Sequence, residues 1–248
     1  MGIMKAFYTF WGVFMGTTVD YVKPEKRPLW PSHVHDVDQS FSYFLGGSGN
    51  CGVLKNGKET LLINCNSGVA SQKLKDNLSG QTPTLIATST FPDYIGGANE
   101  FSFTKIITPR DVSETIEIQW GDETVVIEPV EATFSEKDIV VYLKNRKVLF
   151  LGGLFYNGIH PIIDSQRGLN PKNWVETLQA LVKKYQPSHL VPHEGDVCEA
   201  KKLQGFVDYL QSLSDSAVEF SLCREKFDWP EIPGYTSLEE NFDLLRNR

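Results

Sequence analysis

The chain has 248 residues, of which 41% are hydrophobic and 12% aromatic, a composition that suits a globular core and excludes an intrinsically disordered chain. The formal net charge of −7, with its Lys and Arg residues scattered, argues against nucleic acid as a partner. The four cysteines form no Cys-x-x-Cys pair, so neither a structural zinc site of the usual spacing nor a disulfide scaffold is expected.

Residues 1–22 form an unusually apolar first segment. Between Met4 and Val22 the only charge before Asp20 is that of Lys5. The apolar part is shorter than the roughly 20 residues that span a bilayer comfortably. Three placements stay open: an uncleaved membrane anchor, a helix at the membrane interface and a helix docked on the domain. Residues 23–38, which are rich in proline, are predicted to form an extended linker.

The segment 39–215 is predicted to form one α/β domain. Short apolar and β-branched runs predict its strands, and turn signals such as Asn56-Gly57 and Gly121-Asp122 join several of them into hairpins. The expected strands lie at 41–45, 51–54, 60–63, 84–87, 105–108, 115–118, 124–127, 139–143, 148–151 and 189–191.

Apolar residues at helical spacing predict the helices of this domain. Asn170 followed by Pro171 is typical of a helix start, and Ser237 with Glu240 indicates a capping box for a short terminal helix. The apolar faces are Leu74 and Leu78; Trp174, Leu178, Leu181 and Val182; and Leu203, Phe206, Val207 and Leu210. This order of elements predicts an αββα sandwich, in which two mixed β-sheets are each covered by helices on the outer face.

Four segments, in this order along the chain, resemble the metallo-β-lactamase superfamily. The second resembles the family's His-x-His-x-Asp-His-x-Gly-Gly motif, and the last resembles its Pro-Gly-His-Gly loop. The first and third resemble its early and late hairpins. The segments read NCGVLKNGKETLLINCNSG, TLIATSTFPDYIGGANEF, FSEKDIVVYLKNRKVLFLGGLFYNGIHPIID and LVPHEGD.

The resemblance implies a metal site, but most of the implied ligands have changed type. Of the first motif only Asp93 remains, because its three histidines correspond to Ser89, Phe91 and Tyr94. The later histidine aligns with Phe134, or with Thr133 after a slip of one residue. The bridging aspartate aligns with Gly153, the last histidine with Glu194, or with His193 after a slip, and the aspartate of the first loop with Asn64.

These replacements predict that the chain holds no metal cofactor and has no catalytic residues. Zinc or iron needs about three nitrogen, sulfur or oxygen ligands in fixed geometry. Asp93 with either Glu194 or His193 supplies at most two. Without a metal, no bound water has its pKa lowered toward neutrality, so the family's hydrolysis lacks its nucleophile. We therefore expect a pseudoenzyme.

Other arrangements of reactive residues are weaker. The stretch HVHDVD, from His33 to Asp38, has metal-ligand residue types, but a solvated polar segment explains it as well. His160 is expected in a loop and His189 at the start of a strand. His193 is the base within reach of a nucleophile at Ser89 or Cys65, but such a pair is not favoured.

The resemblance leaves three functions open. The first is an inactive structural or interaction module, an accessory subunit with other protein subunits as partners and a membrane contact through residues 4–22. An organellar membrane, such as the mitochondrial inner membrane, suits that hypothesis, and a cytoplasmic location is the alternative. The second is a residual metal-dependent hydrolase using His33, His35, Asp93 and Glu194. The third is a small-ligand binding module whose pocket is lined by Phe91, Tyr94 and Phe134.

The last segment, residues 216–248, follows the domain as a C-terminal extension. It contains aromatic residues near prolines, among them Phe227, Trp229 and Tyr235. Such residues need an apolar surface to cover them. The extension is therefore expected to pack on the domain or on a partner.

Overall fold

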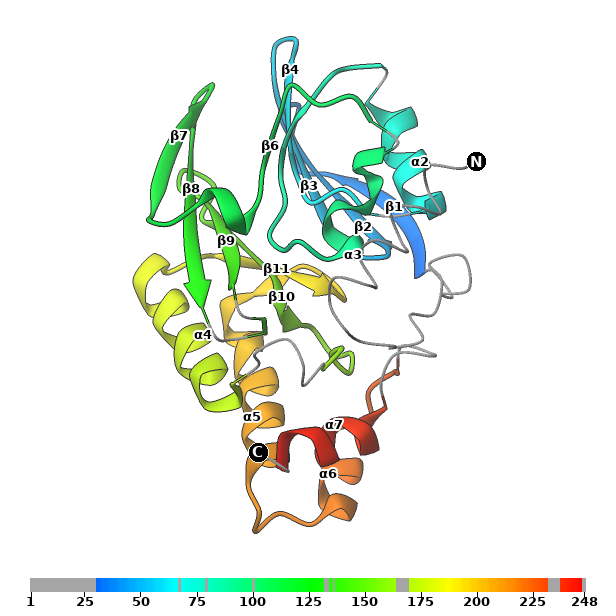
Figure 1. Cartoon of the computed structure of the whole chain (residues 1–248), viewed down its shortest axis with the longest axis vertical. Coiled ribbons are helices and arrows are strands. Elements are labelled where there is room, and N and C mark those ends of the chain that lie inside the picture. The colour runs from blue at the N-terminus through cyan, green and yellow to red at the C-terminus, as the bar shows by residue number, and fades with distance from the viewer. Residues whose placement is uncertain are drawn as a thin grey trace.

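The computed structural model (Figure 1) describes residues 30–66, 68–78, 80–99, 101–131, 134–135, 137–163, 170–231 and 237–246. The apolar N-terminal segment, residues 1–22, lies outside these ranges, so its predicted placements stay predictions. Within the ranges, no helix has both the length and the apolar character needed to cross a membrane.

Two six-stranded mixed sheets form the centre of the described structure. The first has the order β1 (Trp30–Asp36), β2 (Phe41–Gly47), β3 (Cys51–Asn56), β4 (Glu59–Ile63), β5 (Thr84–Ile86) and β6 (Lys105–Ile107). Its first four strands are antiparallel, whereas β4, β5 and β6 run parallel.

The second sheet is antiparallel at both ends and has one parallel pair, β10 with β11. Its order is β12 (Cys198–Glu199), β11 (His189–Glu194), β10 (Val148–Tyr156), β9 (Lys137–Leu143), β8 (Glu123–Glu131) and β7 (Ile116–Trp120). The predicted hairpins are all present, with the turns at Gly57 and Gly121 in the left-handed backbone region that glycine adopts at little cost.

Helices cover the outer face of each sheet, as Figure 1 shows. The first sheet carries α2 (Gly68–Asn77), α3 (Pro92–Ile95) and the 3-10 turn η2 (Gly96–Asn99). The second carries α4 (Pro171–Tyr185) and α5 (Leu203–Ser214), with η5 (Ala200–Lys202) before α5. A further 3-10 turn, η3 (Pro109–Asp111), links the sheets, and α6 (Phe220–Lys226) and α7 (Leu238–Arg246) end the chain.

Three apolar clusters fill the spaces between these layers. One lies between the sheets and includes Phe41, Ile127 and Phe150. The others lie under the helices, around Leu74 beneath α2 and around Trp174 beneath α4. Burial on both faces of each sheet is the arrangement of an αββα sandwich, so the predicted fold class is confirmed.

The predicted helix boundaries rest on side-chain caps that the structure contains. The Asn170 Oδ1 atom accepts a hydrogen bond from the Asn173 backbone N–H at 3.1 Å, and Pro171 is the first helical residue of α4. At α7, Ser237 and Glu240 exchange backbone-to-side-chain hydrogen bonds of 2.8 and 3.2 Å. This reciprocal pair is the predicted capping box.

The predicted linker is wrong for residues 30–36, because they form β1 at the edge of the first sheet and pair antiparallel with β2. The folded domain therefore begins before residue 39. His33 and His35, which the sequence placed in the linker, are exposed on this strand. The His35 ring stacks on Tyr43 of β2 at 6.1 Å.

The described part of the C-terminal extension packs on the domain. Cys223 and Phe227 from α6 and its end are buried, as are Leu238 and Leu245 of α7. All four belong to the apolar cluster that also contains the residues of α5.

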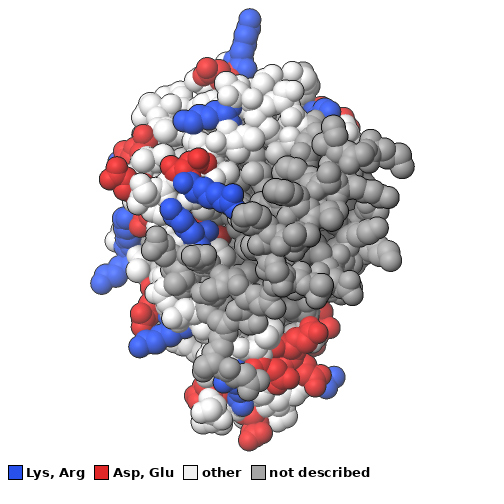
Figure 2. Space-filling view, viewed as in Figure 1, with Lys and Arg blue, Asp and Glu red and all other residues white. Residues whose placement is uncertain are grey.

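Charged residues of both signs are interspersed on the described surface visible in Figure 2. The visible face therefore lacks a broad area of one sign among the described residues, in keeping with the scattered Lys and Arg positions along the chain. Such a surface provides little long-range attraction for polyanions.

Candidate functional site

The candidate site is built on the stretch TSTFPDYIGG, residues 88–97, which leaves the carboxyl end of β5. Phe91 has an extended backbone and precedes Pro92, which begins α3. The fixed φ angle of proline suits this first helical position. The chain therefore turns helical at once, and Asp93 and Tyr94 in this short helix are both buried.

Tyr94 is stacked on a histidine from the other sheet. Its ring lies 4.3 Å from the ring of His193, at the end of β11, with an angle of 20° between the planes. Tyr156 of β10 meets the same imidazole edge-on at 5.5 Å. All three side chains are at most 2% exposed, so this ring cluster is closed to solvent.

The Tyr94 hydroxyl fills the space beside Gly153. A Cβ atom added to Gly153 would lie 2.6 Å from that hydroxyl and 2.5 Å from the Phe134 ring. Real Cβ atoms do not come so close to other heavy atoms, so a side chain at position 153 would displace one of these rings. Gly153, which the sequence resemblance predicts to stand where the family has its bridging aspartate, thus has no room for a carboxylate.

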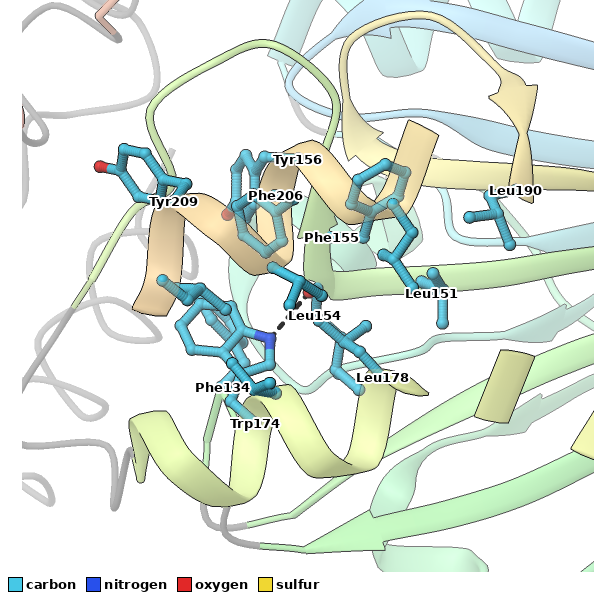
Figure 3. Close-up of a cluster of buried hydrophobic side chains, with 14 of the residues drawn as sticks. Phe134, Leu151, Leu154, Phe155, Tyr156, Trp174, Leu178, Leu190, Phe206 and Tyr209 are labelled. Carbon is cyan, nitrogen blue, oxygen red and sulfur yellow. Dashed lines mark hydrogen bonds between the residues drawn. The ribbon is translucent and has the colours of Figure 1, made fainter. Parts of the chain in front are cut away.

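Phe134 joins this position to the apolar core beneath α4. Its ring lies 6.2 Å from Phe91 and 5.8 Å from Trp174, in edge-to-face geometry in both pairs. The Trp174 indole N–H donates a 2.7 Å hydrogen bond to the Leu154 carbonyl, drawn as a dashed line in Figure 3. The figure also places Phe134 beside Trp174, with Tyr156 and Phe206 in the same cluster.

We call the residues Phe91, Tyr94, Phe134, Tyr156 and His193 the aromatic plug. Edge-to-face and offset-stacked rings attract one another in addition to the area that they bury. The plug is therefore a set of packed rings that stabilise one another. The sequence could not indicate Tyr156, because it ends a continuous apolar strand without any motif.

A set of hydrogen bonds, which we call the loop brace, supports the start of the stretch 88–97. The Asn64 Oδ1 atom accepts hydrogen bonds from the Thr88 N–H and hydroxyl at 2.8 and 3.0 Å. Asn64 has a φ angle of 62°, in the left-handed region that asparagine tolerates. Asn66, also left-handed, accepts from the backbone and hydroxyl of Ser48 and donates to the Cys51 sulfur. These bonds hold the start of the loop and the segments beside it.

The acidic residues Asp93 and Glu194 are both buried, at 7% and 2% exposure. Glu194 Oε1 lies 3.9 Å from His193 Nε2, so these two neighbours form a contact within the strand end. His193 is held further by Asn50, whose backbone N–H donates to the His193 carbonyl at 2.7 Å. Within the described residues, no three His, Cys, Asp or Glu side chains gather into a group that could hold a metal ion.

The nucleophiles considered from the sequence lie at the site but are not activated. Ser89 is buried, and its hydroxyl has no hydrogen-bond partner among the described residues, so His193 does not act on it as a base in this structure. Burial raises the pKa of the Cys65 thiol well above its ordinary value, and the neighbouring Cys51 raises it further. A protonated, inaccessible thiol is a poor nucleophile.

The two remaining histidines lie away from the plug. His160 is in a loop, as expected, but it is buried and its Nδ1 atom lies 3.1 Å from the Tyr209 hydroxyl. His189 begins β11 and is exposed. Neither belongs to a group of three metal-ligating side chains in the described ranges.

The residues at the site do not fit the metal that the fold family implies. Tyr94 and Phe134 fill the space beside Gly153, and Phe91 adds a third ring against Phe134. A metal there would require these rings to leave a closed, well-packed cluster.

Comparison with known proteins finds no matching family model and no matching curated protein. Solved structures do match. A metallo-β-lactamase from Pontibacter korlensis aligns with a TM-score of 0.55 at 15% identity, covering 73% of this chain and 99% of that chain. The metallo-β-lactamase DIM-1 aligns with a TM-score of 0.58 at 12% identity, covering 74% and 99%. TMB-1 aligns with a TM-score of 0.58 at 15% identity, covering 75% and 100%.

Identities this low carry information about the fold rather than about activity. The alignments cover nearly the whole of each solved structure and about three quarters of this chain. They agree with the two mixed sheets and flanking helices described above. The chain therefore has the metallo-β-lactamase fold.

Proposed function

We propose that this protein is a metallo-β-lactamase-like pseudoenzyme, which acts as a structural or interaction module of a larger assembly. The observation that carries the proposal is the filled space beside Gly153, where the Tyr94 hydroxyl and the Phe134 ring leave no room for a carboxylate. The aromatic plug closes the position at which the fold family places its chemistry. A site that cannot seat a metal cannot lower the pKa of a bound water.

The intact fold around the closed site supports a role in assembly. The sheets, the capped helices and the loop brace are all present, although most of the implied ligand residue types are not. Stability resides in this core, so a fold can keep its shape for presenting surfaces after its site has changed. Other protein subunits are the proposed partners, with a membrane contact through residues 4–22, as at a mitochondrial inner membrane.

Metal analysis of the purified full chain tests the first part of the proposal. We expect less than about 0.1 zinc or iron per chain, because a high-affinity site needs about three protein ligands. The matched control is a variant with the ligand residue types restored at six positions: Ser89→His, Phe91→His, Tyr94→His, Phe134→His, Gly153→Asp and Glu194→His. Stoichiometric metal in the natural chain that is lost on Asp93→Ala would contradict the proposal and favour the residual hydrolase.

Membrane extraction and co-purification test the second part. The full chain is expected to co-purify with other subunits in a mild detergent, and deletion of residues 1–22 is expected to release the domain from the membrane fraction. A metal-free chain that stays monomeric without partners would sink the assembly role. Such a result would leave a binding module as the function to pursue.

A further inference from the structure

The described structure has four sheet edges: β1 and β6 on the first sheet, β7 and β12 on the second. An edge strand presents unpaired backbone N–H and C=O groups, with which a strand of a second chain can pair. Proteins usually blunt such edges, which means that short strands, prolines or irregular register make this pairing unfavourable. Three of the four edges are blunted. The strand β12 has two residues and β6 has three, while β1 contains Pro31 and shifts register between Trp30 and His33.

The fourth edge strand, β7, has none of these devices. Its five residues pair one to one with β8, without a register shift, from Ile116 opposite Ile127 to Trp120 opposite Glu123. It contains no proline and no lysine. Within the described ranges no strand pairs with its outer side, and Figure 1 shows β7 at the margin of the molecule.

The two faces of β7 differ in polarity. Ile116, Ile118 and Trp120 are half-buried and pack against the cluster between the sheets, whereas Glu117 and Gln119 are exposed on the opposite face. The apolar row, which consists of Ile116, Ile118 and Trp120, is thus covered by the cluster between the sheets and ends at the unpaired edge of β7. The Trp120 indole N–H is buried and has no hydrogen-bond partner among the described residues.

We propose that β7 is a homodimer interface, at which it pairs antiparallel with β7 of a second copy about a two-fold axis at Ile118. The five residues are self-complementary in this register. Ile118 faces its own copy, Ile116 faces Trp120, and Glu117 faces Gln119. Aliphatic and aromatic cross-strand pairs stabilise a sheet, and no like charges stand opposite each other.

Other registers are worse on the same grounds. A two-fold axis at Glu117 sets two carboxylates directly opposite each other, which is destabilising. An axis at Gln119 leaves Ile116 outside the pairing and sets the turn residue Gly121 opposite Glu117. Only the axis at Ile118 pairs all five residues and continues the apolar row across both copies.

The interface joins two six-stranded sheets into one continuous sheet of the dimer. Pairing of five residues buries less area than a standard stable interface, so the dimer is expected to be weak and reversible. A dissociation constant on the order of 10 μM suits a contact of this size. The inference concerns this edge alone and does not depend on whether the site holds a metal.

Sedimentation velocity of the full chain, at concentrations from about 1 to 100 μM, measures the dimerisation. Variants that carry a positive or a negative charge at residue 118, on the two-fold axis, test the interface. The variants Ile118→Lys and Ile118→Glu each place like charges face to face, so each is expected to weaken dimerisation by at least about tenfold. An equimolar mixture of the two places Lys opposite Glu. This mixture is expected to recover the natural dimerisation constant to within a few-fold.

The matched control is Ile106→Lys on the edge strand β6, where the side chain is 40% exposed. This variant is expected to dimerise like the natural chain, and circular dichroism confirms that every variant is folded. The proposal is overturned if the natural chain stays monomeric throughout the range. It is also overturned if the mixture of the two Ile118 variants stays monomeric, or if Ile106→Lys disrupts the dimer equally.

A cysteine cross-link provides a second measurement that does not depend on charge. In a Cys198→Ser background, the variant Ile118→Cys should form a disulfide-linked dimer in a glutathione redox buffer, because the two copies of residue 118 face each other. Glu117→Cys should not link to itself, because it faces residue 119. Equal linking of both variants would overturn the proposed register.

Discussion

At the scale of single residues, Tyr94 connects more parts of the site than its place in a short loop suggests. Its carbonyl accepts a 3.0 Å hydrogen bond from Cys65, its ring stacks on His193, and its hydroxyl lies beside Gly153. The partners of these contacts lie just after β4 of the first sheet and in β11 and β10 of the second sheet. The ring is therefore part of the packing that holds the two sheets together at this end.

Removal of this ring should destabilise the whole domain. Tyr94→Ala leaves a cavity in a closed cluster and is expected to lower the free energy of unfolding by about 3 to 5 kcal/mol. Tyr94→Phe keeps the ring and should cost less than about 1.5 kcal/mol. Urea unfolding followed by circular dichroism measures both values. If Tyr94→Ala cost no more than Tyr94→Phe, the ring would not be packed as described.

The glycine at position 153 provides a second residue-scale prediction. Gly153→Asp introduces a carboxylate that meets Phe134 and the Tyr94 hydroxyl and buries a charge. The expected loss in unfolding free energy is at least about 3 kcal/mol. Gly205→Ala is the control, because a Cβ atom at that site of α5 meets nothing within 4 Å. That control should stabilise the helix by up to about 1 kcal/mol.

The clash at Gly153 can be assigned to its neighbour by a double-mutant cycle. Phe134→Ala opens space beside position 153, so the double variant with Gly153→Asp should cost less than the sum of the single variants by at least about 1 kcal/mol. Strict additivity in urea unfolding would show that Phe134 is not the group that the new side chain meets.

The residue types at the site could be predicted from the sequence, but their packing could not. The resemblance predicts that Ser89, Phe91, Tyr94, Phe134 and Gly153 stand where the family has ligands, and this assignment stays a prediction. The Tyr94 ring stacks on His193 and fills the space at Gly153. This packing depends on contacts between segments about 60 to 100 residues apart in the sequence. No local pattern reports such distances, because they are set by how the two sheets pack.

At the scale of elements, local signals predicted the hairpins and the capped helices, since these depend on neighbouring residues. The Asn56-Gly57 turn and the Ser237–Glu240 capping box are examples. The edge strand β1 was missed for the opposite reason. Its sequence, with Pro31 and four polar residues, has no strand pattern, and its form comes from pairing with β2.

The helix α7 is joined to the domain by a buried polar network around His160. Asn241 of α7 donates hydrogen bonds of 3.0 Å to both the Tyr209 hydroxyl and the Pro161 carbonyl. His160 Nδ1 lies 3.1 Å from the same hydroxyl, and the His160 backbone N–H donates to Pro230 at 3.2 Å. In the tautomer whose Nδ1 is unprotonated, this atom accepts from the Tyr209 hydroxyl, and protonation of His160 would place a donor there instead.

This network predicts that acidification loosens α7. Burial lowers the pKa of His160 below its ordinary value of 6.5, although Glu231, the Trp229 backbone and Asp228 act in the opposite direction. The packed form therefore binds fewer protons than a released form. Its stability is fully present above about pH 6.5 and is lost as the pH falls from there toward the lowered pKa.

Hydrogen exchange of the α7 amides between pH 7.5 and 5, corrected for intrinsic rates, measures the effect. Protection should fall by up to about tenfold per pH unit below 6.5. The slope should disappear in His160→Gln and remain in His189→Gln, whose side chain is exposed in the natural chain. An unchanged slope in His160→Gln would assign the effect to another group.

At the scale of the whole molecule, the two sheets are joined at one end by a charged cluster. Arg146, between β9 and β10, lies 2.9 Å from Glu123 of β8 and 2.9 Å from Asp38, which follows β1. The guanidinium also donates to Ser40 at 2.7 Å and lies over the Phe41 ring at 5.4 Å. The Glu123 side chain is 2% exposed, so this is a largely buried ion pair.

Loss of one partner should therefore cost far more than loss of a surface pair. Arg146→Met keeps much of the apolar stem but leaves the Glu123 carboxylate buried without its cation, and the expected loss is about 3 to 5 kcal/mol of unfolding free energy. The matched control is Lys144→Met. It removes the Lys144–Glu117 pair, whose side chains are more than half exposed, and should cost less than about 1 kcal/mol.

The double variant Arg146→Met with Glu123→Gln shows how much of the loss in unfolding free energy comes from the unpaired Glu123 charge and how much from lost packing of Arg146. If the unpaired carboxylate causes the loss, replacing it by a neutral amide should recover at least about 1 kcal/mol relative to Arg146→Met alone. Glu123 Oε1 also accepts a 2.7 Å hydrogen bond from the Asn145 backbone, which the Gln amide oxygen can still accept. No recovery in urea unfolding would mean that Arg146 joins the sheets through its contacts with Phe41 and Ser40 rather than by compensating the Glu123 charge.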